Sequence, residues 1–420
     1  MSLSATQAGA LRDLYPRILG KLLGFTGSLA DAEDAVHDAI ERALTTWSID
    51  GAPDSAEAWL ITVAQNAHRD RLRRARRTES HGDAVEVLAQ LSPWARIAVA
   101  EPEIMRGFKD ELLGLLFACA HPSLEVGESA ALALATAVGL SNEEIARAFV
   151  VAPRSMEQRL TRARQKLRER GDAEGTTPER GRERIPAVLR AIHLLFNEGY
   201  WSGDGESPIR ADLCRLALGL ARSLLETYPD EPEVAGLLAL LLLHDARRDA
   251  RLDAQGEPVP LPDQDRSRWD EAAILLATHM LETALAAGKP GPMQIEAAIA
   301  AVHCKAKTAS DTNWREIASL YALLENLRPI PAVRVNRAFA LGMATNASAG
   351  LRLLDSADID AQSYPYVHLV RGTLLADAGQ SAAAAESLRE AARLSRNAHE
   401  RRQIEERIAR LPVTSNGDPK

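Results

Sequence analysis

Arginines gather in two short windows of this sequence. Residues 69–77 hold six arginines against one aspartate, a net charge of +5. Residues 154–170 hold six arginines and one lysine against two glutamates, again +5. Such windows can bind nucleic acid, because Lys and Arg contacts to phosphates supply much of the affinity of protein–DNA complexes. A solvated helix face is the plainer alternative for either window taken alone.

The chain as a whole is acidic, with a net charge of −8 over 420 residues. An even spread of that charge would disfavour nucleic acid, since phosphate binding needs a local positive potential. The prediction of a nucleic-acid partner therefore rests on the two basic windows, despite the negative net charge of the whole chain.

The second window belongs to a pattern typical of a helix-turn-helix. Ser141 followed by Glu144 predicts a capping box, so a helix should begin directly after Ser141. Residues 150–153 provide the turn, and Pro153 is tolerated because it would open the next helix. Residues 140–168 are thus predicted to form two helices joined by a tight turn.

In the second of these helices, Met156, Leu160, Ala163 and Leu167 recur at helical spacing and should face inward. The outward positions are then Arg154, Ser155, Glu157, Gln158, Arg159 and Arg162. Their N-terminal end is the part that enters a major groove, where Arg recognises guanine and Gln recognises adenine. The arginines and lysine further along are better suited to phosphates.

Residues 140–168, LSNEEIARAFVVAPRSMEQRLTRARQKLR, resemble the promoter-binding region 4 of extracytoplasmic-function sigma factors, which belong to the sigma-70 family. The resemblance implies a set of contacts to the upstream promoter element. These are Arg154, Ser155, Gln158, Arg159, Arg162, Arg164 and Lys166.

Residues 31–44, DAEDAVHDAIERAL, resemble region 2.2 of the same family, the helix that docks on the clamp of RNA polymerase. The resemblance implies polymerase contacts by Asp34, His37, Asp38, Ile40 and Glu41. The sequence departs from the family where His37-Asp38 replaces a common Gln-Glu pair and where Leu44 replaces a frequent aromatic residue.

Residues 58–74, AWLITVAQNAHRDRLRR, resemble regions 2.3 and 2.4, which open the downstream promoter element. Opening DNA needs phosphate-binding arginines beside a place for an unstacked base. Asn66 can hydrogen-bond a base edge, and the turn at residues 53–55 could form a pocket rim, whereas Trp59 is predicted to pack in the core. The implied DNA contacts are Asp54, Ser55, Asn66, Arg69, Arg73, Arg74, Arg76 and Arg77.

An all-α fold should position these residues. The chain is 46% apolar but only 4% aromatic, and it lacks the Val/Ile/Thr/Tyr clusters typical of strands. We predict two small helical DNA-binding domains, sigma region 2 at 1–77 and region 4 at 108–170. A connector at 78–107 and a linker at 171–182 separate the parts, followed by a helical-repeat extension at 183–411 and a disordered tail at 412–420.

The extension is predicted to be tetratricopeptide-like. A shift of 34 residues places Arg337-Ala338 on Arg371-Gly372 and Leu354 on Leu388, and 34 is the tetratricopeptide period. An irregular helical array is the alternative. Two stretches interrupt the pattern: 197–208, which puts Tyr200 and Trp201 in a loop, and 251–268, which we expect to be an ordered, docked loop.

Residues 192–201 and 250–270 are similar to a group of sigma factors whose region 4 is followed by an extension of this kind. That similarity implies an extension that itself modulates activity, in a protein without a dedicated membrane anti-sigma partner. An intramolecular contact of the extension with regions 2 and 4 is a further expectation. Core RNA polymerase and promoter DNA are the implied partners.

Other functions find less support in the sequence. His193, Glu198, His279, His303 and Cys304 form no known catalytic, metal or phosphate motif, so we predict no enzyme and no cofactor. The three cysteines are widely spaced and should be buried, and no apolar stretch predicts a membrane span, which favours a cytoplasmic protein. A helix-turn-helix regulator with a repeat sensor domain is the alternative, but it leaves residues 31–74 unexplained.

Overall fold

The computed structural model describes residues 5–26, 28–50, 53, 55–78, 111–170, 178–201, 209–357, 359–361, 364–395 and 398–412. Within these ranges every regular element is a helix, which confirms the predicted all-α class, and an isolated bridge joins Leu252 to Pro258. The chain divides into two compact units, residues 1–194 and 195–420, and the dividing point falls inside one helix. No helix of the described ranges is long and apolar enough to cross a membrane.

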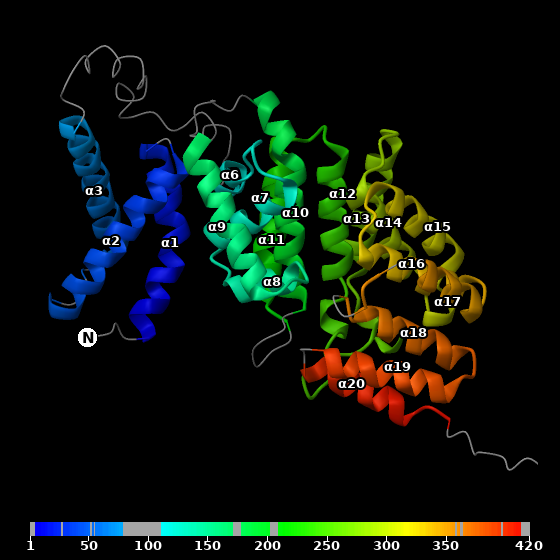
Figure 1. Cartoon of the computed structure of the whole chain (residues 1–420). Coiled ribbons are helices and arrows are strands. Elements are labelled where there is room, and N and C mark those ends of the chain that lie inside the picture. The colour runs from blue at the N-terminus through cyan, green and yellow to red at the C-terminus, as the bar shows by residue number, and fades with distance from the viewer. Residues whose placement is uncertain are drawn as a thin grey trace, which may run out of the picture. The chain divides into compact units, whose positions relative to one another are not determined.

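The first unit opens with the three helices α1 (Ala5–Thr26), α2 (Leu29–Asp50) and α3 (Ala56–Thr78), seen in blue in Figure 1. Their buried faces are built from apolar side chains at helical spacing, such as Ile18 and Leu22 of α1, Val36 of α2 and Leu60 of α3. This packing fixes which faces of α2 and α3 remain outside.

Five further elements of this unit follow: α6 (Glu111–Cys119), α7 (Val126–Ala133), η2 (Leu134–Val138), α8 (Asn142–Ala148) and α9 (Pro153–Arg170). The η2 segment is a π-helical turn that continues α7 and ends at Gly139, whose φ of 77° lies in the left-handed region. The sequence pattern did not predict this turn, because a π turn leaves no distinct spacing of apolar residues.

Helix α10 (Pro178–Tyr200) begins earlier than the end of the predicted linker, so residues 178–182 are helical. Pro178 suits this start, since a proline at the first helical position loses no hydrogen bond. The α10 residue Arg184 donates to the carbonyl oxygen of Phe117 at 3.1 Å, which ties the start of α10 to α6 within the first unit.

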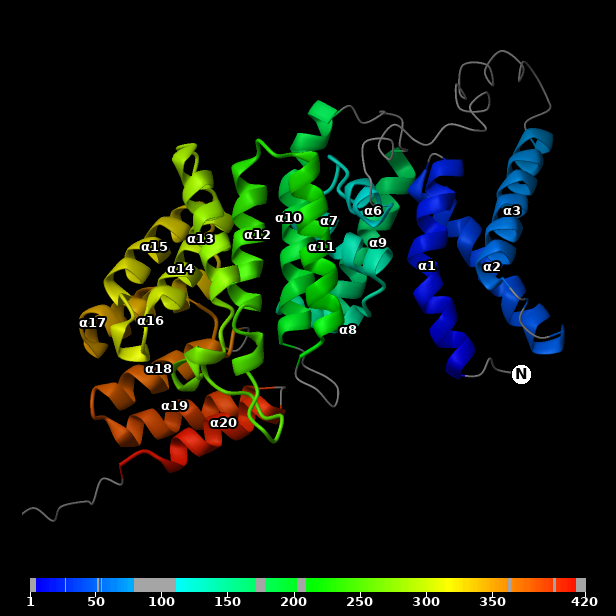
Figure 2. The ribbon, with the colours of Figure 1, turned by 180° about the vertical axis from the view of Figure 1, so that it is seen from behind.

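The second unit is an array of antiparallel helices, each packed on its neighbours (Figures 1 and 2). After the end of α10 it contains α11 (Ala211–Thr227), α12 (Pro232–Asp245), α13 (Glu271–Ala286), α14 (Pro292–Lys305), α15 (Trp314–Leu327), α16 (Pro331–Ala344), α17 (Ala347–Ser356), α18 (Tyr366–Asp377), α19 (Ser381–Leu394) and α20 (Ala398–Ala409). The three cysteines are all buried, as predicted.

The predicted 34-residue period is visible in the close approach of small residues. A Cβ atom on Gly350 of α17 would lie 2.7 Å from the carbonyl oxygen of Ala338 on α16. One period later, a Cβ atom on Gly372 of α18 would lie 3.2 Å from the carbonyl oxygen of Ala384 on α19. Positions 338 and 372 are equivalent in this period, and so are positions 350 and 384. Each helix pair is therefore in closest contact at the same two positions of the repeat, as stacked repeats require.

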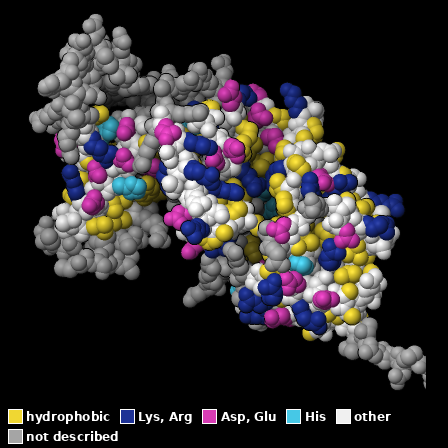
Figure 3. All heavy atoms as spheres, in the orientation of Figure 1, with side chains coloured by type: hydrophobic (Ala, Val, Ile, Leu, Met, Phe, Trp, Pro, Cys, Tyr) yellow, Lys and Arg dark blue, Asp and Glu magenta, His cyan; other side chains and the backbone are white. Residues whose placement is uncertain are grey.

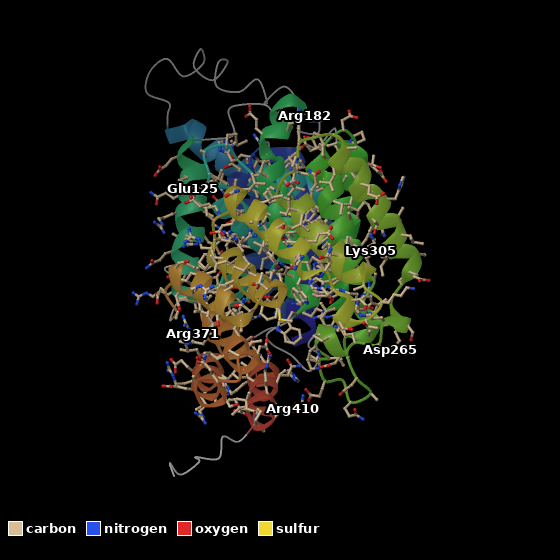
Figure 4. The ribbon with its side chains drawn as sticks, turned by 90° about the vertical axis from the view of Figure 1, so that its right-hand side faces the viewer. Glu125, Arg182, Asp265, Lys305, Arg371 and Arg410 are labelled. Atoms are coloured by element: carbon tan, nitrogen blue, oxygen red, sulfur yellow. The ribbon has the colours of Figure 1, made fainter. Side chains whose placement is uncertain are left out.

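The loop at 251–268 is ordered and docked, as predicted. It contains the short turns η4 (Leu261–Asp263) and η5 (Arg266–Arg268), with η3 (Arg248–Ala250) just before it. Glu257 accepts hydrogen bonds from His399 at 2.9 Å and Arg402 at 2.5 Å, and both donors lie on α20. Asp265, at the far end of the loop, and Lys305, at the end of α14, are labelled in Figure 4.

Several predictions lie outside the described residues. They concern the connector apart from Thr78, the linker at 171–177, the loop at 202–208 and the tail from 413 onward.

Candidate nucleic-acid interface

The capping box predicted at Ser141 is present. The Ser141 hydroxyl accepts the backbone N–H of Glu144 at 3.2 Å, and the Glu144 carboxylate accepts the N–H of Ser141 at 2.6 Å. Two backbone donors that a helix start leaves without partners are thereby satisfied. Helix α8 begins at Asn142, where the sequence placed it.

The turn after α8 is tight and depends on a strained residue. Val150 has a φ of 53°, in the left-handed region that a β-branched residue rarely adopts. The N–H of Val151 returns to the carbonyl oxygen of Ala146 at 2.9 Å, which ends α8, and α9 starts at Pro153. The turn therefore sets the direction in which α9 leaves α8.

Helix α9 divides into a buried and an exposed face as predicted. Met156, Leu160 and Ala163 are 1% exposed or less. The exposed side chains of its first turns include the predicted outward residues Arg154, Ser155, Glu157, Gln158, Arg159 and Arg162. Dark blue Lys and Arg side chains lie over α9 in the space-filling view (Figure 3). The start of this helix therefore exposes guanidinium, amide and carboxylate groups.

Two basic residues further along α9 are engaged within the unit. The Lys166 ammonium lies 2.8 Å from both carboxylate oxygens of Glu128. Burial raises the pKa of Glu128, but hydrogen bonds led by that from Lys166 outweigh it and leave the pKa below its ordinary value. Arg164 Nε lies 4.0 Å from Oε1 of the buried Glu33. Lys166 and Arg164 therefore each have a carboxylate partner within the protein.

Helix α2 presents the residues predicted to meet the polymerase. His37 and Glu41 are exposed, and Ile40 is half-buried. Asp34 and Asp38 both face Arg71 of α3, at 3.4 Å and 2.7 Å. The aspartate side chains keep 44% and 42% of their surface exposed, so they remain accessible from outside.

Helix α3 carries the residues predicted to open DNA. The Ser55 hydroxyl accepts the N–H of Ala58 at 3.4 Å at the start of this helix. Asn66 and Arg69 are exposed neighbours on one face, with Arg69 Nη1 at 3.4 Å from Asn66 Oδ1. Asp54 lies outside the described residues, as do the side chains of Arg73, Arg74, Arg76 and Arg77, whose backbone belongs to α3.

Trp59 packs where we predicted. Its ring centre lies 5.4 Å from that of Trp47, which is 5% exposed, and Leu60 and Ala64 beside it are buried. Trp59 itself is half-buried, and the two indoles join α2 to α3.

Comparison with known proteins agrees with this geometry. Residues 10–78 match the family model of sigma-70 region 2, and residues 115–167 match that of sigma-70 region 4. The chain is a sigma factor of the sigma-70 family. Its two regions are of the extracytoplasmic-function type, and a C-terminal extension follows them.

In this sigma factor, residues 184–285 match a family of unknown function (DUF6596). An uncharacterised protein of Rhizobium meliloti (strain 1021) is 40% identical over 392 residues, which cover 93% of the chain and 92% of that relative. No solved structure matches the chain.

The sigma-70 regions imply that the sigma factor binds core RNA polymerase and promoter DNA and acts in promoter-directed transcription initiation. They indicate a transcription factor and not an enzyme. Sequence reasoning did not single out Arg71 and Glu33 as functionally placed residues. Arg71 lies in the basic window, but no spacing rule reveals that it folds back onto α2.

Glu33 links α2 to the helix-turn-helix part of the sigma factor. It is only 7% exposed and accepts the Thr136 hydroxyl of η2 at 3.1 Å. Burial, followed by the charge of Glu33, raises the pKa of the Tyr15 hydroxyl far above its ordinary value. A glutamate followed 103 residues later by a threonine carries no sequence signal of contact.

Proposed function

We propose that this sigma factor selects promoters through the first three turns of α9. The exposed row formed by Arg154, Gln158, Arg159 and Arg162 carries this proposal, because it stands at the start of a helix behind a tight turn. Recognition helices of this type place their N-terminal residues against base edges in the major groove. Arg suits the two acceptors of guanine, and Gln suits the donor and acceptor of adenine.

Arg164 and Lys166 would add phosphate contacts at the side of the groove. Their carboxylate partners Glu33 and Glu128 compete with phosphate for them, so we expect these two residues to contribute less than the first turns of α9. Phosphate contacts set the position of a protein on DNA and carry no base sequence by themselves.

We assign the opening of the downstream element to α3. Ser55, Asn66 and Arg69 are exposed along this helix, and Arg73, Arg74, Arg76 and Arg77 extend the same helix. Guanidinium groups would hold the backbone of the separated strand, while Asn66 offers a donor and an acceptor to an unstacked base. Asp54 would belong to the rim of the base pocket.

We assign polymerase docking to the exposed side of α2, through Asp34, His37, Asp38, Ile40 and Glu41. The three acidic groups give this side a negative potential, which suits a basic surface on the polymerase clamp.

We further propose that the extension modulates initiation, through contacts with regions 2 and 4 of the same chain. The second unit spans residues 195–420, more than half of the chain. Stacked helix pairs offer an extended surface for binding, which supports a role beyond folding of the DNA-binding part.

Run-off transcription tests the proposal. Purified core RNA polymerase, the full-length sigma factor and a library of promoter fragments are combined, and transcripts are mapped. Transcripts from a defined subset of fragments are expected. Specific duplex binding without any transcript would favour an operator-binding regulator instead.

A further inference from the structure

The end of α10 and the loop at 251–268 meet at one place in the second unit. Tyr200 is the last residue of α10, so it is helical and does not lie in the loop that we predicted from residue 197 onward. The end of α10 contributes Tyr200 and Trp201, and the loop at 251–268 contributes Arg251, Arg266 and, just beyond it, Trp269. The end of α12 adds Arg247. We call Arg247, Arg251 and Arg266 the arginine cluster.

Aromatic rings line this cluster. The guanidinium carbon of Arg251 lies 3.4 Å from the centre of the Tyr200 ring and 5.6 Å from that of Trp201. The Trp269 ring lies between the other two arginines, at 5.9 Å from Arg247 and 4.5 Å from Arg266. Cation–π contacts of this kind stabilise a guanidinium group.

The hydrogen-bond partners of the cluster in the described part of the chain include no carboxylate. Arg247 Nη2 lies 3.3 Å from the Tyr200 hydroxyl and 2.7 Å from His244 Nδ1. Arg251 donates to the carbonyl oxygen of Tyr200. Arg266 donates to the carbonyl oxygens of His303 and Ala306 at 2.8 Å and 2.7 Å. None of these hydrogen bonds goes to a carboxylate.

Burial makes this lack of a counter-charge costly. Arg247 and Arg251 are 6% and 8% exposed, and Arg247 Nε is buried without a hydrogen-bond partner among the described residues. A guanidinium does not lose its proton in a protein, so it cannot escape the cost of a buried charge by neutralising itself. The neighbouring Arg248, by contrast, forms an ion pair with the carboxylate of Asp245.

The positive charges of the cluster also act on His303, a titratable residue beside it. Burial, and then the charges of Arg247 and Arg266, lower the pKa of His303 to about 4. Burial also lowers the pKa of Arg266, although Cys304 and Asp311 act in the opposite direction. The arginines of the cluster therefore leave a positive potential at this place.

We infer that the arginine cluster binds a phosphate group of a small anionic molecule. Guanidinium forks match phosphate oxygens in geometry and charge, and the neighbouring indoles could stack on a base attached to that phosphate. Arg266 and Trp201 are only half-buried and mark the side from which the anion would enter. The inference stands apart from promoter recognition, since all cluster residues belong to the second unit.

Titration calorimetry and thermal unfolding of the full-length protein with inorganic pyrophosphate test this inference. The buffer is free of phosphate, and sodium chloride holds the ionic strength constant. Arg266→Met removes a cluster arginine. Arg268→Met is the matched control, because Arg268 lies two residues further along the same loop but is exposed. This control is needed because the arginines of α3 and α9 also attract phosphate.

We expect pyrophosphate to bind the wild type and Arg268→Met alike and to raise their unfolding temperature. Arg266→Met should bind about tenfold more weakly and lose most of that temperature shift. Arg247→Lys, which keeps the charge but not the fork, should also weaken binding. ATP binding more tightly than pyrophosphate would indicate a nucleotide, and equal binding would indicate a free phosphate anion.

Two results would overturn the inference. One is the absence of both heat and temperature shift in the wild type at millimolar pyrophosphate. The other is binding by Arg266→Met as tight as that by Arg268→Met, which would place the anion on the DNA-binding helices. The wild-type titration decides the first point even if a variant fails to fold.

Discussion

Arg71 of α3 holds Asp38 of α2, with Nη2 at 2.7 Å and Nε at 3.3 Å from the same carboxylate oxygen. The helix that we propose docks on the polymerase is thus joined to the helix that we propose opens DNA. The two side chains remain 31% and 42% exposed, so we expect the pair to stabilise the fold by only about 0–1 kcal/mol. Its position, and not its strength, makes it useful for a test.

Asp38→Asn and Arg71→Met remove the same ion pair from opposite sides. Their effects on stability should be small and similar, but only Asp38 faces the polymerase in our proposal. We expect Asp38→Asn to weaken binding to core RNA polymerase severalfold, whereas Arg71→Met leaves it equal or tighter because it frees Asp38. Fluorescence anisotropy with labelled sigma factor measures this, and equal losses in both variants would contradict the assignment of Asp38.

Replacing Arg159 and Arg162 by alanine should abolish promoter selection while leaving the fold intact. Each bidentate contact to a base contributes about 1–3 kcal/mol of discrimination, and exposed side chains contribute little to stability. The measure is the ratio of promoter to non-specific DNA affinity at fixed salt. The control replaces Arg215 and Arg222, two exposed arginines of α11, by alanine. Normal promoter binding by the Arg159/Arg162 variant would refute the role given to α9.

Ser141→Ala should destabilise the helix-turn-helix by about 1 kcal/mol, because it removes the hydroxyl that accepts the Glu144 N–H. Promoter affinity should fall with it, since α8 positions α9. Asn142→Ala is the control: Asn142 is exposed and lies one residue further on. Hydrogen exchange of the Glu144 amide is the direct readout, and unchanged protection in Ser141→Ala would count against the capping box.

The local parts of this site could be predicted because local physics decides them. A serine three residues before a glutamate fixes the start of α8, and apolar spacing fixes the buried face of α9. The same holds for the repeat, in which Ala338 and Gly372 stand one period apart. The cap and the buried face need only neighbours within one or two helical turns, and the repeat is recognised because its pattern recurs along the chain.

The parts that escaped prediction depend on contacts between distant residues. Arg71 meets Asp38 and Glu33 meets Thr136 because helices pack, and no spacing in the sequence records either contact. The arginine cluster is the clearest case. Its two interrupting stretches were recognised as unusual, yet only the fold brings Arg251 onto the Tyr200 ring.

Removing residues 195–420 tests modulation by the extension. This cut keeps the first seventeen residues of α10, including Arg184, whose side chain donates to Phe117 in the first unit. We expect promoter-reporter output in cells to change by about threefold or more, in either direction. A second cut after residue 182 also removes Arg184 and should lower the unfolding temperature of the remaining unit. Unchanged output with the longer fragment would argue against a regulatory extension.

The low pKa of His303 predicts a stability change with pH. Because the folded state holds this pKa at about 4, against 6.5 for an ordinary histidine, the unfolded chain binds more protons between these values. The contribution to stability is complete above about pH 6.5 and is lost as pH falls toward 4. Its slope is up to about 1.4 kcal/mol per pH unit.

His303→Gln should flatten that slope, because glutamine does not titrate. The free energy of unfolding is measured by urea titration at several pH values from 4.5 to 7.5, and wild type and variant are compared at each pH so that carboxylate titration cancels. His279→Gln is the control, since His279 is exposed on α13. Parallel curves for wild type and His303→Gln would mean that His303 binds a proton in the folded state as readily as in the unfolded chain. The positive potential at the arginine cluster would then be weaker than we infer from its lack of a carboxylate partner.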